Sequence, residues 1–246
     1  MRNILIASVA ALLAASSNAQ AAEIKALITT AMDGAVVVLV PQFEKATGHK
    51  VTVSYDPSGG LARRLRGGEF ADMILVASPE LDKLIAEGKV VGNRIDVSRT
   101  GIGIAIRKGA PKPDVSTPEA LKRTLLAAKT IGYSKLGASG TLFLQVAEKL
   151  GIGQEVKAKL VETNGVVGEL IVEGKAEIGV QQIPELMAVP GVAIAGPLPG
   201  DLQVITTFSA AQSAKPQQAE AAKAFIQFLK GAAAQSAFKA KGLDPA

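Results

Sequence analysis

The chain has 246 residues, a formal net charge of +5 at pH 7 and no cysteine. The lack of cysteine excludes disulfides, zinc–thiolate centres and a nucleophilic cysteine, so stability must come from buried apolar surface. The basic residues are scattered and only 4% of all residues are aromatic, a composition that argues against nucleic-acid binding. The mild positive charge instead favours the attraction of small anions.

The N-terminus has the pattern of an export signal. Arg2 supplies a positive start, an apolar run follows from 4 to 15, and Ala19-Gln20-Ala21 is a small-x-small cleavage site. The apolar run is shorter than the ~20 residues that a membrane-spanning helix needs. We therefore predict a signal peptide over 1–22, cleaved near Ala21, and a soluble exported protein. A retained N-terminal anchor is the alternative.

The first part of the mature chain alternates apolar runs with helical patterns, which is typical of α/β units around mainly parallel sheets. Ser78-Pro79-Glu80 has the serine cap, the proline and the early acid of a helix start. The expected strands are 23–28, 50–54 and 72–77, and the expected helices are 35–47, 59–67 and 78–88.

The second part begins after Thr100 with an alternating strand at 101–107 and a proline-containing loop at 108–113. Helices are expected at 117–128, 140–150 and 165–173, with one helical turn at 184–187, and strands at 131–134 and 177–181. A stiff connector at 196–200 then precedes a strand at 203–208 and helices at 216–229 and 232–240.

Catalytic sets of the usual kind are not evident. His49, the only histidine, is expected in a solvated turn, so neither a Ser-His-Asp triad nor a histidine-rich metal site is predicted. Acids on helix surfaces are expected to be solvated. Asp33 and Asp56 are harder to set aside because both lie in loops that follow strands. We expect no metal and no cofactor.

Small hydroxyl and glycine residues recur where strands give way to helices. They are Thr29-Thr30, Ser58-Gly59-Gly60, Ser78 and Ser139-Gly140-Thr141. Helix starts offer free N–H groups and partial positive charge, and ligands of open parallel sheets bind at the carboxyl ends of strands. One such turn is ordinary capping. Four of them, from both parts of the chain, predict an anion site.

Several stretches together resemble a known family. TTAMDGA, PQFEKATGHKV, PSGGLARRLRGGEFADMILVAS and FIQFLKGAAAQSAF are similar, and in the same order, to stretches of periplasmic solute-binding proteins of the molybdate-binding type. The resemblance covers nearly the whole mature chain, and 58–78 is its most specific part. The stretches IGVQQIPEL and GPLPGDLQ resemble a divergent branch that includes relatives of exported aconitate isomerase.

The resemblance implies a two-lobed α/β fold of the periplasmic-binding-protein type, with two mixed or mainly parallel sheets joined by two hinge strands. Lobe 1 would comprise 23–103 plus 204–246, and lobe 2 would comprise 104–203. The hinge candidates are 101–107 and 203–208. A ligand would lie in the cleft, and the lobes would close on it by a hinge motion. The family also implies a periplasmic location.

The family binds an oxyanion through hydroxyls and backbone N–H groups of the two lobes. By resemblance, Thr30 matches the first-turn serine, Ser58 and Gly59 lie in the second serine-rich turn, and Ser139-Gly140 opens a helix of the second lobe. This chain has Gln181-Gln182 where the family commonly has a tyrosine, and fewer hydroxyls in the second turn. Amides in place of hydroxyls suit a planar carboxylate at least as well as a tetrahedral oxyanion.

Arg64 is expected to make a bidentate contact if the ligand carries several carboxylates, with a plain surface charge as the alternative. Arg63 is expected to pair with an acid such as Asp72. The expected ligand contacts are Thr29, Thr30, Ser58, Gly59, Arg64, Ser78, Ser139, Gly140 and Gln181.

The leading interpretation is a monomeric binding protein that captures a small anion, either an organic acid or a molybdate-like oxyanion, for the permease of an ABC-type transporter. The alternative is an aconitate isomerase, which needs a base for allylic proton transfer. Asp33, Asp56, Tyr133 and Lys135 are candidates for that base, and no catalytic residue is assigned. A receptor that presents its bound form to a signalling partner is a third possibility.

Overall fold

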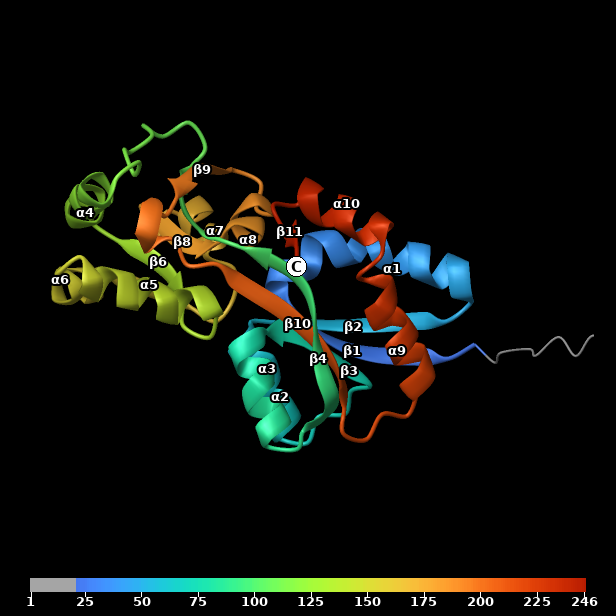
Figure 1. Cartoon of the computed structure of the whole chain (residues 1–246). Coiled ribbons are helices and arrows are strands. Elements are labelled where there is room, and N and C mark those ends of the chain that lie inside the picture. The colour runs from blue at the N-terminus through green and yellow to red at the C-terminus, as the bar shows by residue number, and fades with distance from the viewer. Residues whose placement is uncertain (1–20) are drawn as a thin grey trace, which may run out of the picture.

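The computed structural model describes residues 21–246 (Figure 1), so most of the predicted signal peptide lies outside the described part. The first sheet has the order β11-β4-β10-β3-β1-β2, with β1, β2 and β3 parallel and β10 antiparallel to β3 and β4. Its strands are β1 (Glu23–Thr29), β2 (Lys50–Asp56), β3 (Met73–Ala77), β4 (Val90–Thr100), β10 (Thr206–Ser213) and β11 (Asp244–Pro245).

The second sheet has the order β7-β6-β8-β5-β9. Its strands β6, β7 and β8 are parallel, whereas β5 is antiparallel to both β8 and β9. These strands are β5 (Ile102–Arg107), β6 (Ile131–Ser134), β7 (Leu160–Thr163), β8 (Ile178–Gln182) and β9 (Val192–Pro197). The predicted fold class, two mixed sheets in an α/β protein, is confirmed.

Helices cover both faces of each sheet (Figure 1). We call each sheet with its helices a unit. The first unit has α1 (Asp33–Thr47), α2 (Ser58–Arg66), α3 (Ser78–Ala86), α9 (Ala219–Phe228) and α10 (Ala232–Ala240), with the 3-10 turn η1 (Thr30–Met32). The second unit has α4 (Pro118–Ala127), α5 (Ala138–Lys149), α6 (Gly153–Lys157), α7 (Val167–Val172) and α8 (Ile183–Met187); η2 (Gly200–Leu202) follows β9. Within 21–246, no helix is long and apolar enough to cross a membrane.

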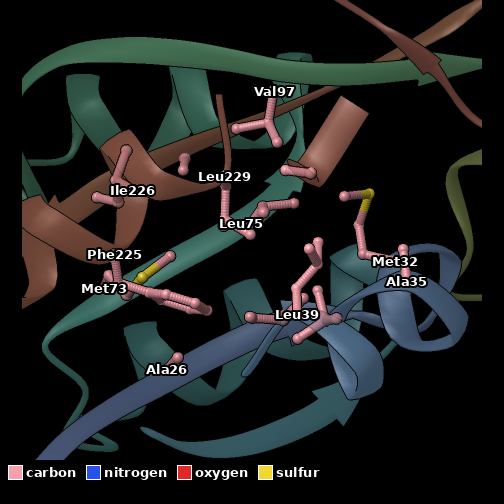
Figure 2. Close-up of a cluster of buried hydrophobic side chains, with 14 of the residues drawn as sticks. Ala26, Met32, Ala35, Leu39, Met73, Leu75, Val97, Phe225, Ile226 and Leu229 are labelled. Carbon is pink, nitrogen blue, oxygen red and sulfur yellow. The ribbon is translucent and has the colours of Figure 1, made fainter. Parts of the chain in front are cut away.

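Strand β3 shows why the first sheet is covered on both sides. All five of its residues are buried. Met73 and Leu75 point to the cluster formed with α1 and α9, where Phe225 packs (Figure 2), whereas Ile74 and Val76 point to the cluster under α2 and α3. A parallel strand with helices on both faces has no solvent side, which explains the uninterrupted apolar run in its sequence.

Four strands were not expected, one of which is the two-residue β11. The other three are β4, β7 and β9, and part of the predicted connector at 196–200 belongs to β9. β4 is mostly exposed over 91–94, where its sequence is polar and lacks an apolar alternation. It forms because both edges are paired, with β10 on one side and β11 on the other. That pairing is a long-range feature which local periodicity does not report.

Asp72 ties the start of β3 to two distant segments. Its buried carboxylate accepts hydrogen bonds from the backbone N–H of Lys25 at 2.8 Å and from those of Gln217 and Gln218 at 2.7 and 2.8 Å. The expected pairing with Arg63 is therefore wrong, because Asp72 is satisfied by backbone donors. Asp72 instead joins β1 to the segment that leads into α9.

The chain passes between the sheets twice, at Gly101 and between 197 and 206. Gln203 joins the two passages, because its Oε1 accepts from the Ile102 N–H at 2.8 Å and its Nε2 donates to the Ile102 carbonyl at 3.0 Å. A Cβ on Gly101 would lie only 2.8 Å from Cδ of Gln203, so the glycine permits this contact. The lobe boundaries and hinge motion remain predictions.

Candidate binding cleft between the two units

The helix starts of the two units face one another at the carboxyl ends of the strands. The backbone N–H of Gly59, in the first turn of α2, donates to the Leu136 carbonyl at 3.1 Å. Thr30, which follows β1, donates its hydroxyl to Oε1 of Glu185 in α8 at 2.6 Å. Two of the three turns that the sequence singled out in the first unit thus contact the second unit directly, whereas Ser78 bonds within its own unit.

The hydroxyls of the first unit are linked to one another. Ser58 Oγ donates to Thr29 Oγ1 at 3.2 Å and accepts from the backbone N–H of Ala77 at 3.1 Å. Ser78 Oγ donates to the Thr207 carbonyl at 3.0 Å and lies 2.6 Å from Oγ of Ser209. Thr29, Ser58 and Ser78 are all buried, so this network fixes the starts of α2 and α3.

A cavity of about 590 Å³ opens between the units. It contains three of the predicted contacts, Ser58, Gly59 and Ser78, and this volume lies in the range of small-molecule sites. Lys83, Arg94 and Lys135 also line it, but each already lies within 3.2 Å of an acidic side chain. The remaining lining comes mainly from the starts of α3 and α5 and from 204–207.

Three buried polar atoms of the second unit have no hydrogen-bond partner among residues 21–246. They are Ser134 Oγ at the end of β6, Ser139 Oγ in the first turn of α5 and Gln182 Oε1 at the end of β8. A Cβ on Gly137 would lie 2.9 Å from Ser134 Oγ and 3.5 Å from Ser139 Oγ, so the two hydroxyls border one point. Gln182 donates through Nε2 to Thr206 at 2.7 Å, which leaves its oxygen open. Unpaired buried polar atoms are costly, so this cluster indicates a site that a polar ligand completes.

Glu185 is the one ionisable side chain among the buried polar residues of the facing turns, with 6% of its surface exposed. Burial raises its pKa to about 7, and hydrogen bonds from Thr30 and Gln181 only partly oppose that shift. Gln181 is itself held by the backbone N–H of Val167, which donates to its Oε1 at 2.7 Å. Gln181 therefore supports Glu185 and the start of α7.

Glu185 and Ser134 were missed as site residues. An acid in the first turn of a helix, after a proline, normally indicates a solvated residue next to the helix dipole. Its burial arises from packing of α8 on η1 of the other unit. The only local signal was the glutamine pair Gln181-Gln182 just before it, which placed amides rather than apolar residues at the end of a strand.

Gly140 has a packing role. A Cβ on this residue would collide with the Ser134 carbonyl oxygen, so glycine lets the first turn of α5 lie against the end of β6. Gly59 has a similar role, since a Cβ there would lie 2.9 Å from the Leu136 carbonyl oxygen of the other unit. Both glycines bring backbone close to the cleft.

The variant Gly140→Ala is expected to lower the free energy of unfolding by about 1–3 kcal/mol, because the added methyl group overpacks against backbone that cannot rotate away. Gly34→Ala in α1 is the matched control, because the nearest atom to its Cβ is 3.6 Å away. Thermal unfolding of both variants measures the difference. Equal melting temperatures would contradict the close contact between α5 and β6.

Arg64 does not line the cavity, and its guanidinium group is bound to acidic side chains. It donates through Nε and Nη2 to the Glu69 carboxylate at 2.6 Å each, and its Nη1 lies 3.7 Å from Asp56. The Asp56 carboxylate occupies the space that a Cβ on Gly60 would need. A contact between Arg64 and a ligand remains a prediction, but it requires the bonds to Glu69 to break.

The four candidate bases are dispersed. Asp33 is exposed at the start of α1, and Asp56 belongs to the ion pair just described. Tyr133 and Lys135 both bond to the exposed Glu162, at 3.3 and 3.2 Å. Burial, with a smaller effect of Glu162, raises the pKa of Tyr133. Of these four residues, only Lys135 lines the cavity.

Comparison with known proteins gives consistent matches over the whole fold. A family model described as bacterial extracellular solute-binding protein matches residues 24–244. Aconitate isomerase from Pseudomonas sp. is 36% identical over 248 aligned positions, which cover 96% of this chain and 94% of that protein. The molybdate-binding protein ModA of Azotobacter vinelandii is 30% identical over 250 positions, covering 98% and 97%.

Solved structures show the same fold. The periplasmic molybdate-binding protein of Azotobacter vinelandii superposes with a TM-score of 0.76 at 22% identity, covering 89% of this chain and 98% of that chain. The structure described as the tungstate ABC transporter from Geobacter sulfurreducens has a TM-score of 0.69 at 22% identity, with the same coverage.

Proposed function

Because the chain belongs to the bacterial extracellular solute-binding protein family, we propose that it captures a small anion, an organic acid or an oxyanion, between its two units and delivers it to an ABC-type transporter. The observation that carries this proposal is the cluster of buried, unpaired polar atoms where helix starts of both units meet. Hydroxyls, amides and helix N–H groups bind anions without a fixed cation. The molybdate- and tungstate-related names of similar structures support an anionic ligand.

The proposed transport role requires that the protein is in the periplasm and that it meets a membrane permease. The signal-peptide pattern at 1–22 and the family support export to the periplasm, where a monomer would meet the permease of its transporter. The chain crosses between the units at two neighbouring points, joined by Gln203, so a hinge motion there would open the cleft.

A second candidate function is isomerisation of aconitate. Two observations favour it: the 36% identity to a named aconitate isomerase, and the buried Glu185 carboxyl, whose pKa of about 7 suits a proton-transfer group. The reaction removes a proton from the CH₂ carbon, shifts the allylic electron pair, and returns a proton to the former vinylic carbon. One C–H bond breaks and one forms, so no oxidant or cofactor is needed.

A ligand panel tests the proposal. Molybdate, sulfate, citrate, cis-aconitate and trans-aconitate are added to the purified protein, and at least one is expected to raise the melting temperature, because a ligand that binds only the folded protein stabilises it. The ratio of the two aconitates is followed in the same samples. Interconversion establishes the second candidate, and its absence with a stabilising ligand eliminates it. No stabilisation by any anion would contradict the capture proposal.

Ser139→Ala provides a specific variant for this panel. Its hydroxyl has no partner within 21–246, so its removal should leave the stability of the free protein nearly unchanged. A hydrogen bond to a charged ligand is worth about 1.5–3 kcal/mol, so affinity is expected to fall by roughly 10- to 100-fold. Ser116→Ala, at an exposed loop site, is the control. Unchanged affinity of Ser139→Ala would place the ligand elsewhere.

A further inference from the structure

Glu185 is an isolated carboxyl at the contact between the units. It lies in the first turn of α8, a helix that packs on η1 of the first unit, and receives a 2.6 Å hydrogen bond from Thr30. Thr30 is a predicted ligand contact, and Gln182, with its unpaired oxygen, lies three residues before Glu185. The lining of the cavity of about 590 Å³ does not include Thr30, Gln182 or Glu185, so a ligand meets this carboxyl group only if it extends beyond that cavity to the end of β8.

The surroundings of Glu185 supply no charge to balance it. The elements packed against α8 are β9, η1, α7, β5 and β8. η1, β8 and β9 have no ionisable side chain, while Glu169 of α7 and Arg107 of β5 are exposed. Asp33, after η1, and Lys241, beside the glycine that approaches Met187, are exposed too. No ion pair with Glu185 occurs in the described part of the chain.

An anion beside an ionised Glu185 would place two like charges together in a buried site. Such pairs repel strongly, and a single proton shared between the two groups removes the repulsion. A carboxylate can share a proton with a buried acid near neutral pH, whereas sulfate, the anion of a much stronger acid, holds a proton poorly. The lone carboxyl therefore favours one class of anion over the other.

We propose that Glu185 is a ligand-contacting residue that shares one proton with a carboxylate of a bound organic acid, so that the cleft selects organic acids over anions of strong acids such as sulfate. The proposal rests on anion capture in this cleft. The raised pKa of Glu185 agrees with it, because a carboxyl that already holds its proton up to near neutral pH accepts an anionic neighbour more easily. Above that pH, the proton is taken up from solvent when the ligand binds.

Calorimetric titration with citrate and with each aconitate between pH 6 and 9 tests the proposal. The affinity of the unmodified protein for the ligand that binds is expected to fall about tenfold per pH unit above pH 7. Glu185→Gln keeps the size and hydrogen-bonding capacity of the side chain but cannot ionise, so its affinity should not vary with pH. Glu169→Gln on the neighbouring helix α7 is the matched control and should retain the full pH dependence.

The unmodified protein gives a second measurement that needs no variant. Binding heats at pH 8 in two buffers of different ionisation enthalpy should show uptake of about one proton per ligand. No proton uptake, or the same pH dependence in Glu185→Gln, would overturn the role of Glu185 while leaving anion capture intact. Binding of molybdate or sulfate but of no organic acid would also overturn the role of Glu185 and leave anion capture intact. Failure of every anion to bind would overturn both proposals.

Discussion

The variant Glu185→Gln is expected to be more stable than the unmodified protein at pH 8, by up to about 3 kcal/mol in the free energy of unfolding. The carboxyl has a pKa of about 7 in the folded protein, against an ordinary value of 4.5. Between these values the folded state binds more protons than the unfolded state, so stability falls as pH rises from 4.5 to 7. Above pH 7 the full cost of a buried charge is present and stays constant.

Urea denaturation at a series of pH values from 4.5 to 8 measures this effect without ligand. The stability difference between Glu185→Gln and the unmodified protein should grow through the range and level off above pH 7. Glu169→Gln, an exposed site, should follow the unmodified protein. A constant difference at all pH values would show that Glu185 ionises normally and that its surroundings are more polar than the contacts indicate.

Asp72→Ala is expected to destabilise the protein by about 3–5 kcal/mol, because it strands three backbone N–H groups that now donate to a fully buried carboxylate. For a chain of this size that loss lowers the melting temperature by roughly 10 °C. Thermal unfolding measures it. The melting temperature of Asp72→Asn should lie between those of Asp72→Ala and the unmodified protein, since its amide retains one acceptor oxygen.

The control for Asp72 is Asp82→Ala, since Asp82 is an exposed acid whose ion pair with Arg94 lies on the surface. Surface ion pairs contribute about 0–1 kcal/mol, so its melting temperature should barely change. Similar losses for both aspartates would mean that the Asp72 carboxylate does not hold β1 and the α9 segment together.

Much of the fold follows from local patterns. Apolar runs separated by turn residues predict the parallel strands and the helices that follow them, including the start of α3 at Ser78-Pro79, although the expected serine cap is wrong because Ser78 Oγ donates to the Thr207 carbonyl. β4 was not predicted, because its exposed polar half is paired only with β10, and β11, near the C-terminus, pairs with its other half at Ser98 and Arg99. The information that makes it a strand lies more than a hundred residues away along the chain.

The candidate site likewise contains residues that local sequence patterns predict and residues that they do not. Thr30 and Ser139 were predicted as ligand contacts because hydroxyls at helix starts have a local physical meaning. Glu185 was not, because its burial depends on Thr30, which is 155 residues away in sequence. For Arg64 the contact with a ligand stays a prediction, and local sequence did not indicate its two hydrogen bonds to Glu69.

The Gln203 side chain has a consequence for the engineering of such a protein by domain insertion. Its amide pairs with both backbone groups of Ile102, so the chain leaves the first sheet and comes back to it at a single place. Residues between these points form, in topological terms, an insertion within an otherwise continuous unit. A different insert could be spliced in at the same place, while the helix starts of the original half remained in position.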